Sequence, residues 1–325
     1  MTHFKSIFSH LLLILIFLGF LSACSNQDSL TEPDENQSDI EAMQKLTDED
    51  EDLQSFEPNY NEEDVMDFIF PKTAAEIYPV RVGQKMRLVN KNLNVTFEGD
   101  IAYGVLTKTF EGKLFIAASF EPFDTLGANL IDTLVEKEFR TVVTRNIIFE
   151  KVNNSLSDFW KWRIIAISLP EGGTLTENIL ITKLTAYLPN GDTLTIDSPN
   201  DYYLHRGPGK FGWFGRRFWH QFPDIGRFEE VTIVVNVQSA YEADDFVTLT
   251  YGARRNGYNR AKKRFELVSS EFDGQYYQKV YQATYTTHQH IGPYHAIINA
   301  MPKQVIYDDS TPVEINTWGF PYFVR

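Results

Sequence analysis

The sequence contains one cysteine, Cys24, and no apolar run long enough to cross a lipid bilayer. A single thiol cannot form an internal disulfide, so no disulfide framework holds the chain. The apolar stretch from Leu11 to Leu18 is far shorter than the roughly 20 residues that a membrane-spanning helix needs. The sequence also lacks a G-x-S-x-G elbow, an H-E-x-x-H pair and a phosphate-binding loop. The common signatures of serine hydrolases, zinc proteases and P-loop nucleotide-binding enzymes are therefore missing.

Acidic charge is concentrated in residues 25–67, which hold 16 Asp and Glu against one basic residue, Lys45. Low hydrophobicity combined with a net charge of −15 predicts a disordered segment, because too little apolar surface is available to offset chain entropy. Subtracting this −15 and the +1 of Lys5 from the total of −14 leaves residues 68–325 without net charge. A neutral body gives no electrostatic reason to expect a nucleic acid as partner.

Residues 1–23 have the three parts of a secretory signal: a head with Lys5, an apolar stretch, and small residues before a cleavage point. The string Leu21-Ser22-Ala23-Cys24 at that point resembles the lipobox of bacterial lipoproteins. The resemblance implies a thioether-linked lipid on Cys24, cleavage before it and acylation of the new terminus. It also implies, through Ser25, sorting to the outer membrane. We therefore expect a lipid-anchored protein of the bacterial cell envelope, with the membrane as partner and no cofactor besides the lipid at Cys24.

The body is rich in aromatic and β-branched residues with frequent turn signals, which predicts a mainly β protein. Alternation at Val231, Ile233, Val235 and Val237 is typical of a half-buried strand. We expect hairpins around Glu111-Gly112 and around Pro189-Asn190-Gly191-Asp192, a strand at Gln304–Tyr307, and a helix or long loop at Asp124–Glu138.

Strand spacing and composition together divide the chain into two β-rich domains behind an acidic tether. The second domain has about seven short strands and resembles an immunoglobulin-like sandwich in architecture only, while the first is a sandwich or an α+β domain. The expected boundaries are 1–23 for the signal peptide, 24–67 for the lipidated cysteine and disordered acidic tether, 68–204 for the first β-rich domain, 205–228 for a basic aromatic linker, and 229–325 for the immunoglobulin-like β-sandwich.

The linker is the strongest candidate for a binding segment, since it combines cations and aromatic rings without any acid between 205 and 223. Such groups stack on sugar rings, dock anionic groups or form protein-binding hot spots. Two other interpretations stay open: the aromatic residues pack as a joint between domains, or the cations hold the acidic tether in cis. The candidate binding residues are Arg206, Lys210, Trp213, Phe214, Arg216, Arg217 and Trp219.

Three histidines form the one candidate metal site. His288 and His290 share a face if they lie on a strand, and His295 could return on the next strand. No thiol or carboxylate is obviously paired with them, so the pattern equally fits exposed histidines that bind nothing.

These observations favour a membrane-anchored lipoprotein that presents β-domains for binding or envelope assembly, with a glycan or an envelope protein as partner. Contact through sheet edges is one form that such assembly could take. The alternative is an envelope hydrolase acting on polysaccharide through a pair of carboxylates that the sequence does not identify. The missing motifs favour the non-enzymatic interpretation.

Overall fold

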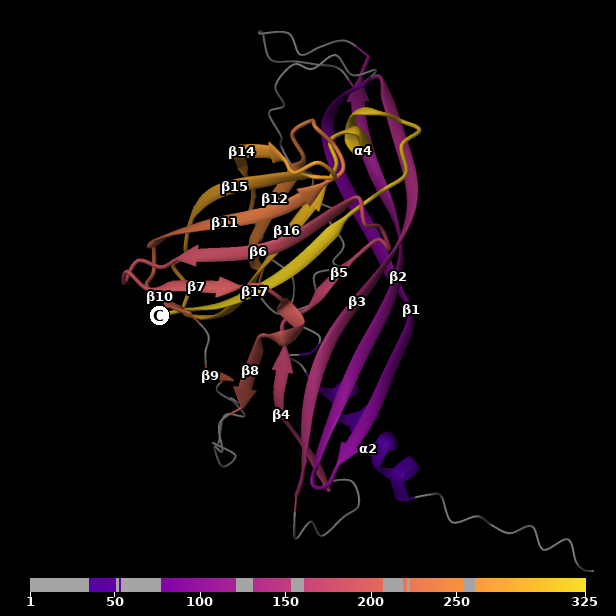
Figure 1. Cartoon of the computed structure of the whole chain (residues 1–325), viewed down its shortest axis with the longest axis vertical. Coiled ribbons are helices and arrows are strands. Elements are labelled where there is room, and N and C mark those ends of the chain that lie inside the picture. Colours follow the sequence, from indigo (N-terminus) through magenta and orange to yellow (C-terminus); the bar gives the residue numbers. More distant parts are fainter. Residues whose placement is uncertain are drawn as a thin grey trace, which may run out of the picture. The chain divides into compact units, whose positions relative to one another are not determined.

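The computed structural model describes residues 35–50, 53, 77–120, 131–152, 161–206, 219–220, 223–253 and 261–325. The signal peptide and Cys24 lie outside this part of the chain. Two compact units are present, Met1–Glu41 and Ala42–Arg325, and the described strands all belong to the second (Figure 1).

The elements run in the following order, given with their bounds: α2 (Glu35–Glu49), β1 (Tyr78–Glu98), β2 (Ile101–Ser119), β3 (Thr133–Lys151), β4 (Trp162–Ser168), β5 (Glu171–Gly173), β6 (Ile179–Tyr187), β7 (Thr193–Ile196), η2 (Pro199–Asp201), β8 (Tyr203–Arg206), β9 (Trp219–His220), β10 (Asp224–Ile225), β11 (Glu230–Ser239), β12 (Phe246–Ala253), β13 (Ala261–Arg264), β14 (Glu266–Phe272), β15 (Tyr277–Thr286), β16 (Gly292–Met301), α4 (Gln304–Tyr307) and β17 (Asn316–Val324). The expectation of a mainly β protein is confirmed.

The strands form two sheets. The larger has twelve strands in the order β13-β12-β16-β17-β5-β3-β4-β8-β9, with β2 and then β1 added beside β3 and with β10 beside β17. The smaller has the order β14-β15-β11-β6-β7. All pairings are antiparallel except the short β10–β17 pair. Residues of both sheets, among them Leu184, Val235, Ile298 and Phe320, belong to one buried apolar cluster, so the sheets pack against each other.

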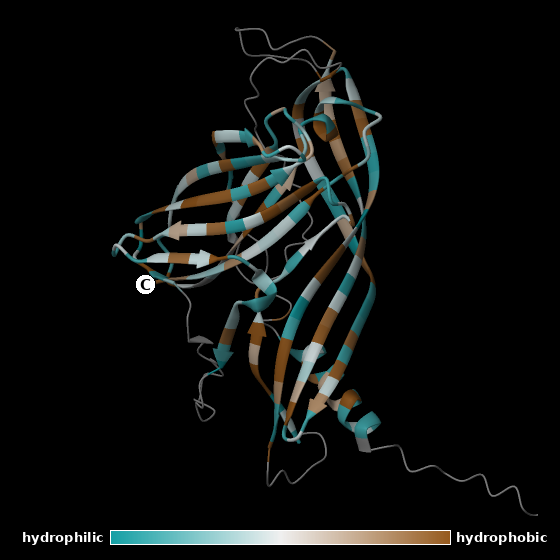
Figure 2. Cartoon of the chain, in the orientation of Figure 1, coloured by the Kyte–Doolittle hydropathy of each residue, from teal (hydrophilic) through white to brown (hydrophobic). Residues whose placement is uncertain are grey.

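Alternation of apolar and polar residues drives this packing. Figure 2 shows hydrophobic and hydrophilic residues alternating along the strands. On β11, Val231, Ile233, Val235 and Val237 are fully buried while their neighbours are half-buried, as the alternation predicted. The hairpin at Asn190-Gly191 is also confirmed: β6 pairs with β7, and Gly191 has a φ of +87° that suits glycine in a tight turn.

β1, β2 and β3 form an unusually long antiparallel meander of 21, 19 and 19 residues, and they run side by side in Figure 1. The expected hairpin at Glu111-Gly112 is wrong, because β2 passes through both residues. A Cβ atom on Gly112 would lie 2.6 Å from Met86 Cγ and 2.8 Å from Phe139 Cζ. This glycine therefore allows neighbouring side chains to approach the strand and does not mark a turn.

The expected division into domains 68–204 and 229–325 does not match the sheets. β6 and β7, from before the expected boundary, complete the five-stranded sheet with β11, β14 and β15 from after it. β5 likewise joins β3 to β17. The sandwich is therefore assembled from both halves of the chain. The sequence-based division missed this, because strand pairing between distant segments is not visible in local patterns.

Three local expectations also need correction. Residues 133–138 are the beginning of β3 and not helix or loop, whereas 124–130 lie outside the described residues. Gln304–Tyr307 is a short helix, in which the backbone N–H of Tyr307 donates to the carbonyl of Lys303 at 3.2 Å and that of Asp308 donates to the carbonyl of Gln304 at 3.0 Å. The acidic tether was expected to be disordered, but Glu35–Glu49 is helical and Met43 is fully buried. Its apolar residues Ile40, Met43 and Leu46 recur at helical spacing, whereas the expectation of disorder rested on low hydrophobicity and net charge.

Candidate functional site

Four cations gather on the inner side of the long meander and at the end of β8. Lys91 of β1 lies opposite Lys108 of β2, and Leu106, two residues before Lys108, lies opposite Arg145 of β3. Cross-strand partners project from the same face of a sheet, so these three cations are neighbours. Arg206 ends β8. We call Lys91, Lys108, Arg145 and Arg206 the basic surface.

The acidic segment that follows the expected signal peptide covers this surface. Asp48, near the end of α2, forms an ion pair with Lys91, and Asp50 forms one with Arg206. The side chains of Arg206 and Asp50 are only 5% and 4% exposed. The other carboxylate oxygen of Asp50 accepts a hydrogen bond from the backbone N–H of Leu53 at 3.1 Å. Asp50 thus turns the chain after α2 and ties it to β8.

Apolar side chains of the same segment complete the contact. Met43 and Leu53 are fully buried and belong to the core cluster that also contains Leu93, Leu106 and Ile147 of the meander. Leu46 packs against that cluster. Burial of a Met or Leu side chain contributes roughly 1.5–3 kcal/mol. Residues 43–53 are therefore held by apolar burial and by two ion pairs together.

The basic surface is electrostatically crowded. The pKa of the Lys108 ammonium is lowered to about 8, mainly by burial and also by the neighbouring Arg145 guanidinium, while Asp48 opposes both effects. Lys108 is 7% exposed and Arg145 is 2% exposed. Placing cations side by side under a cover favours an anionic group above them. The arrangement is suited to holding carboxylates and has no evident means of cleaving a bond.

Among the candidate binding residues, Arg206 is the one whose side chain the structure describes, and it forms an ion pair with Asp50. This contact agrees with the interpretation that the cations hold the acidic tether in cis. Trp219 lies in β9, and its side chain is outside the described residues, as are Lys210, Trp213, Phe214, Arg216 and Arg217.

The sequence-based prediction did not include Lys91, Lys108 and Arg145, because these residues come from three different strands. The available signal was a charged residue at an inward position of an alternating strand, as in Leu106-Thr107-Lys108-Thr109-Phe110.

Of the three candidate histidines, the structure describes the side chains of His288 and His290. His288 packs among tyrosines, with ring centroids 5.7 Å from Tyr251 and 5.1 Å from Tyr294. His290 is exposed, and the side chain of His295 lies outside the described residues. Across the described part of the chain, no three His, Cys, Asp or Glu side chains are grouped to hold a metal ion.

A second polar cluster surrounds Glu171 of β5. Asn200 donates hydrogen bonds from Nδ2 to Glu171 Oε2 at 3.2 Å and to Thr144 Oγ1 at 3.0 Å. Burial raises the pKa of the Glu171 carboxyl; the neighbouring Trp318 indole lowers it in part, and the charge of Asp201 raises it further. A half-buried carboxyl whose pKa is raised beside a second carboxylate has the properties of a general acid. Sequence patterns did not identify this cluster, since its members come from four elements.

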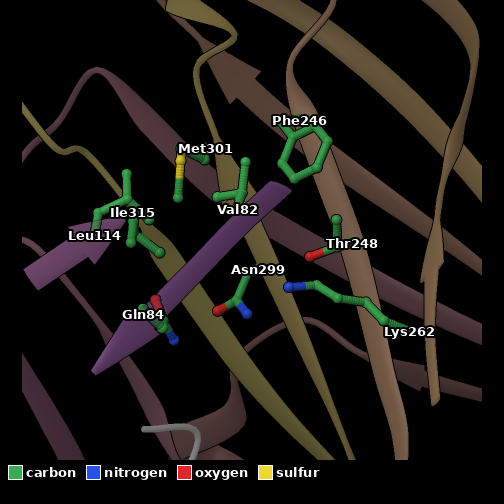
Figure 3. Close-up of a pocket in the computed structure, with 9 residues that line it drawn as sticks. All are labelled: Val82, Gln84, Leu114, Phe246, Thr248, Lys262, Asn299, Met301 and Ile315. Atoms are coloured by element: carbon green, nitrogen blue, oxygen red, sulfur yellow. The ribbon is translucent and has the colours of Figure 1, made fainter. Parts of the chain in front are cut away.

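A pocket of about 340 Å³, partly open to solvent, lies where the start of the meander meets β12, β13 and β16. Figure 3 shows the amine of Lys262 pointing toward the amide of Asn299. Asn299 is already engaged, because its Oδ1 accepts a hydrogen bond from the Thr317 hydroxyl at 2.7 Å. One side of the pocket is polar and is lined by Gln84, Thr248, Lys262 and Asn299. The other side is apolar and is lined by Val82, Leu114, Phe246, Met301 and Ile315.

No family model matches the chain, and no curated protein is significantly similar to it. None of the helices in the described ranges has the length and apolar character needed to span a membrane.

Proposed function

We propose that this protein is a lipid-anchored lipoprotein of the bacterial envelope, attached through Cys24, whose β-body binds an envelope partner and catalyses no reaction. The observation that carries the binding role is the docking of Asp48 and Asp50 on the basic surface. The surface already holds a peptide segment through charge and apolar burial, as a protein-binding surface does. The signal peptide and the lipobox support the anchor, and Ser25 supports the outer membrane.

The edge of the smaller sheet supports the assembly form of this function. β14 pairs with β15 on one side, and all seven of its residues are exposed, including Val268 at 60% and Phe272 at 58%. An exposed sheet edge with apolar side chains is a template on which an extended segment of a partner adds a strand.

The anchor is tested by metabolic labelling with an alkyne fatty acid, comparing the wild type with Cys24→Ala. We expect label and membrane association in the wild type, and neither in the variant. Ser25→Asp is the control for sorting, because it should keep the label and change the membrane fraction. An unlabelled wild-type protein would overturn the anchor.

The binding role is tested in cells with a photo-crosslinking amino acid at Val268 or Phe272 in the full chain. A discrete crosslinked envelope protein is expected at these positions. The matched control places the crosslinker at Leu175, which is 90% exposed but lies between β5 and β6, away from that edge. Identical products at all three positions would show that the edge has no specific partner.

A second candidate function, hydrolysis of envelope polysaccharide, is favoured by the Glu171 cluster. Glu171 would protonate the leaving oxygen, and Asp201 is the neighbouring carboxylate. The test is release of reducing ends from envelope polysaccharide by wild type, Glu171→Gln and the exposed control Glu177→Gln. Activity lost in Glu171→Gln alone would establish the enzyme, and no activity in the wild type would remove this candidate.

A further inference from the structure

We propose that the basic surface is a docking site for an acidic segment of a partner protein whose first part is an amphipathic helix, and that residues 43–50 with Leu53 are a built-in competitor for that site. The proposal rests on the binding role proposed above and specifies the class of partner and the regulation. The segment that covers the basic surface then serves as a template for the partner.

The template has a defined pattern. Met43 and Leu46, three residues apart, lie on one helical face and contribute apolar contacts. Asp48 and Asp50 follow and contact Lys91 and Arg206, and Leu53 closes the segment. A partner segment that fits must present two apolar residues one turn apart on a helix that ends just after the first carboxylate, then a second carboxylate beyond the helix, then a further apolar residue.

The partner is a protein because of the apolar half of the site. Met43 and Leu53 are fully buried beside the charges, so an anionic glycan could satisfy the cations but would leave apolar surface uncovered. An acidic amphipathic segment satisfies both halves.

When the protein's own segment occupies the site, a partner binds only the molecules whose site is open. The apparent affinity for the partner is therefore reduced in proportion to that open fraction. Weakening the contact between the protein's own acidic segment and the basic surface must therefore strengthen binding of a separate partner. This inverse relation distinguishes a competitor from a purely structural segment, whose loss would only destabilise the protein.

The experiment measures fluorescence anisotropy of a labelled peptide of residues 38–54 with the full chain in detergent micelles. The variant Asp48→Asn/Asp50→Asn opens the site, and we expect it to bind the peptide at least tenfold more tightly than the wild type does. A peptide carrying the same two substitutions is the matched control and should bind neither chain. Raising the salt concentration should weaken binding to the open variant because the ion pairs are screened.

A charge-exchange experiment distinguishes loss of the binding site from misfolding of the variant. Arg206→Asp in the open variant should abolish binding of the natural peptide and should accept a peptide with Asp50→Arg, which a misfolded chain cannot do. Equal affinity of wild type and open variant would overturn the regulation, and no binding to the open variant would overturn the site. Concentration-dependent dimers that vanish in the open variant would assign the site to a second copy and overturn the partner. None of these readings requires lipid on Cys24, so failure of the anchor is recognised separately.

Discussion

The ammonium group of Lys279 lies 2.9 Å from a carboxylate oxygen of Asp245, and neither side chain has any exposed surface. Lys279 belongs to β15 of the smaller sheet, and Asp245 precedes β12 of the larger sheet. The other carboxylate oxygen of Asp245 accepts a hydrogen bond from Ser239 Oγ at 3.1 Å, and Lys279 also donates to the backbone carbonyl of Ala243. This network joins the two sheets where β11 leads into β12.

We predict that Lys279→Met lowers the free energy of unfolding by ~3–5 kcal/mol, because removal of one member of a buried ion pair leaves the other charge without compensation. The measurement is urea-induced unfolding followed by circular dichroism. Lys263→Met, at the exposed position of β13, is the matched control and should be close to neutral. The double variant Lys279→Met/Asp245→Asn should recover part of the loss; equal losses in single and double variants would contradict the pairing.

The same carboxyl predicts a pH dependence. Burial raises the pKa of Asp245 to about 6, against the opposing charge of Lys279. The folded state therefore holds this proton more tightly than the unfolded state does. Its contribution to stability is fully present below about pH 4 and is lost as the pH rises through about 6.

Unfolding free energies of wild type and Asp245→Asn, measured from pH 4 to pH 7, give this contribution by difference. The wild type should lose stability relative to the variant as the pH rises through this range. A wild type that instead gains stability relative to Asp245→Asn as the pH rises would mean that Asp245 is held ionised in the folded state.

Sequence patterns predicted local β-structure well and long-range arrangement poorly. The alternation from Val231 to Val237 and the turn at Asn190-Gly191 depend on neighbouring residues, so the sequence carries them directly. The role of Gly112 depends on Met86 and Phe139, which arrive from two other strands. Glycine has the same appearance in a sequence whether it permits a turn or a close approach.

The candidate site was only partly predictable for the same reason. Acidic residues 25–67 and the basic segment that begins near Arg206 were visible as complementary charges, and Asp50 does contact Arg206. Lys91 and Lys108 became part of the site through the pairing of β1 with β2. The buried pair of Asp245 and Lys279 is likewise not visible in local sequence, because Lys279 reaches Asp245 from a distant strand.

A second buried lysine predicts a local effect on α4. Lys137 of β3 donates hydrogen bonds from Nζ to the backbone carbonyls of Val305 at 2.7 Å and Thr311 at 2.8 Å, and to that of Asp308. Lys137→Met should cost about 2–3 kcal/mol, since three carbonyl groups lose a charged donor. Hydrogen exchange over residues 304–315 should accelerate more than elsewhere.

Lys113→Met on neighbouring β2 is the control for Lys137. The Lys113 side chain is 48% exposed and pairs with Glu136 at the surface, so its loss should cost less than about 1 kcal/mol. Uniform acceleration of exchange across the whole chain in Lys137→Met would show global destabilisation and would contradict a specific role at α4.

Gly173 gives a prediction that separates backbone strain from lack of space. It has a φ of +152°, and a Cβ atom there would lie 2.1 Å from the carbonyl oxygen of Ile315. Gly191 also has a positive φ, +87°, but a Cβ there would have no atom within 4 Å. Gly191→Ala should therefore cost only ~1 kcal/mol for the unfavourable backbone conformation. Gly173→Ala adds a backbone clash that forces β5 away from β17, so thermal unfolding should show a much larger loss for this variant. Equal losses would mean that β5 can move aside without disturbing the larger sheet.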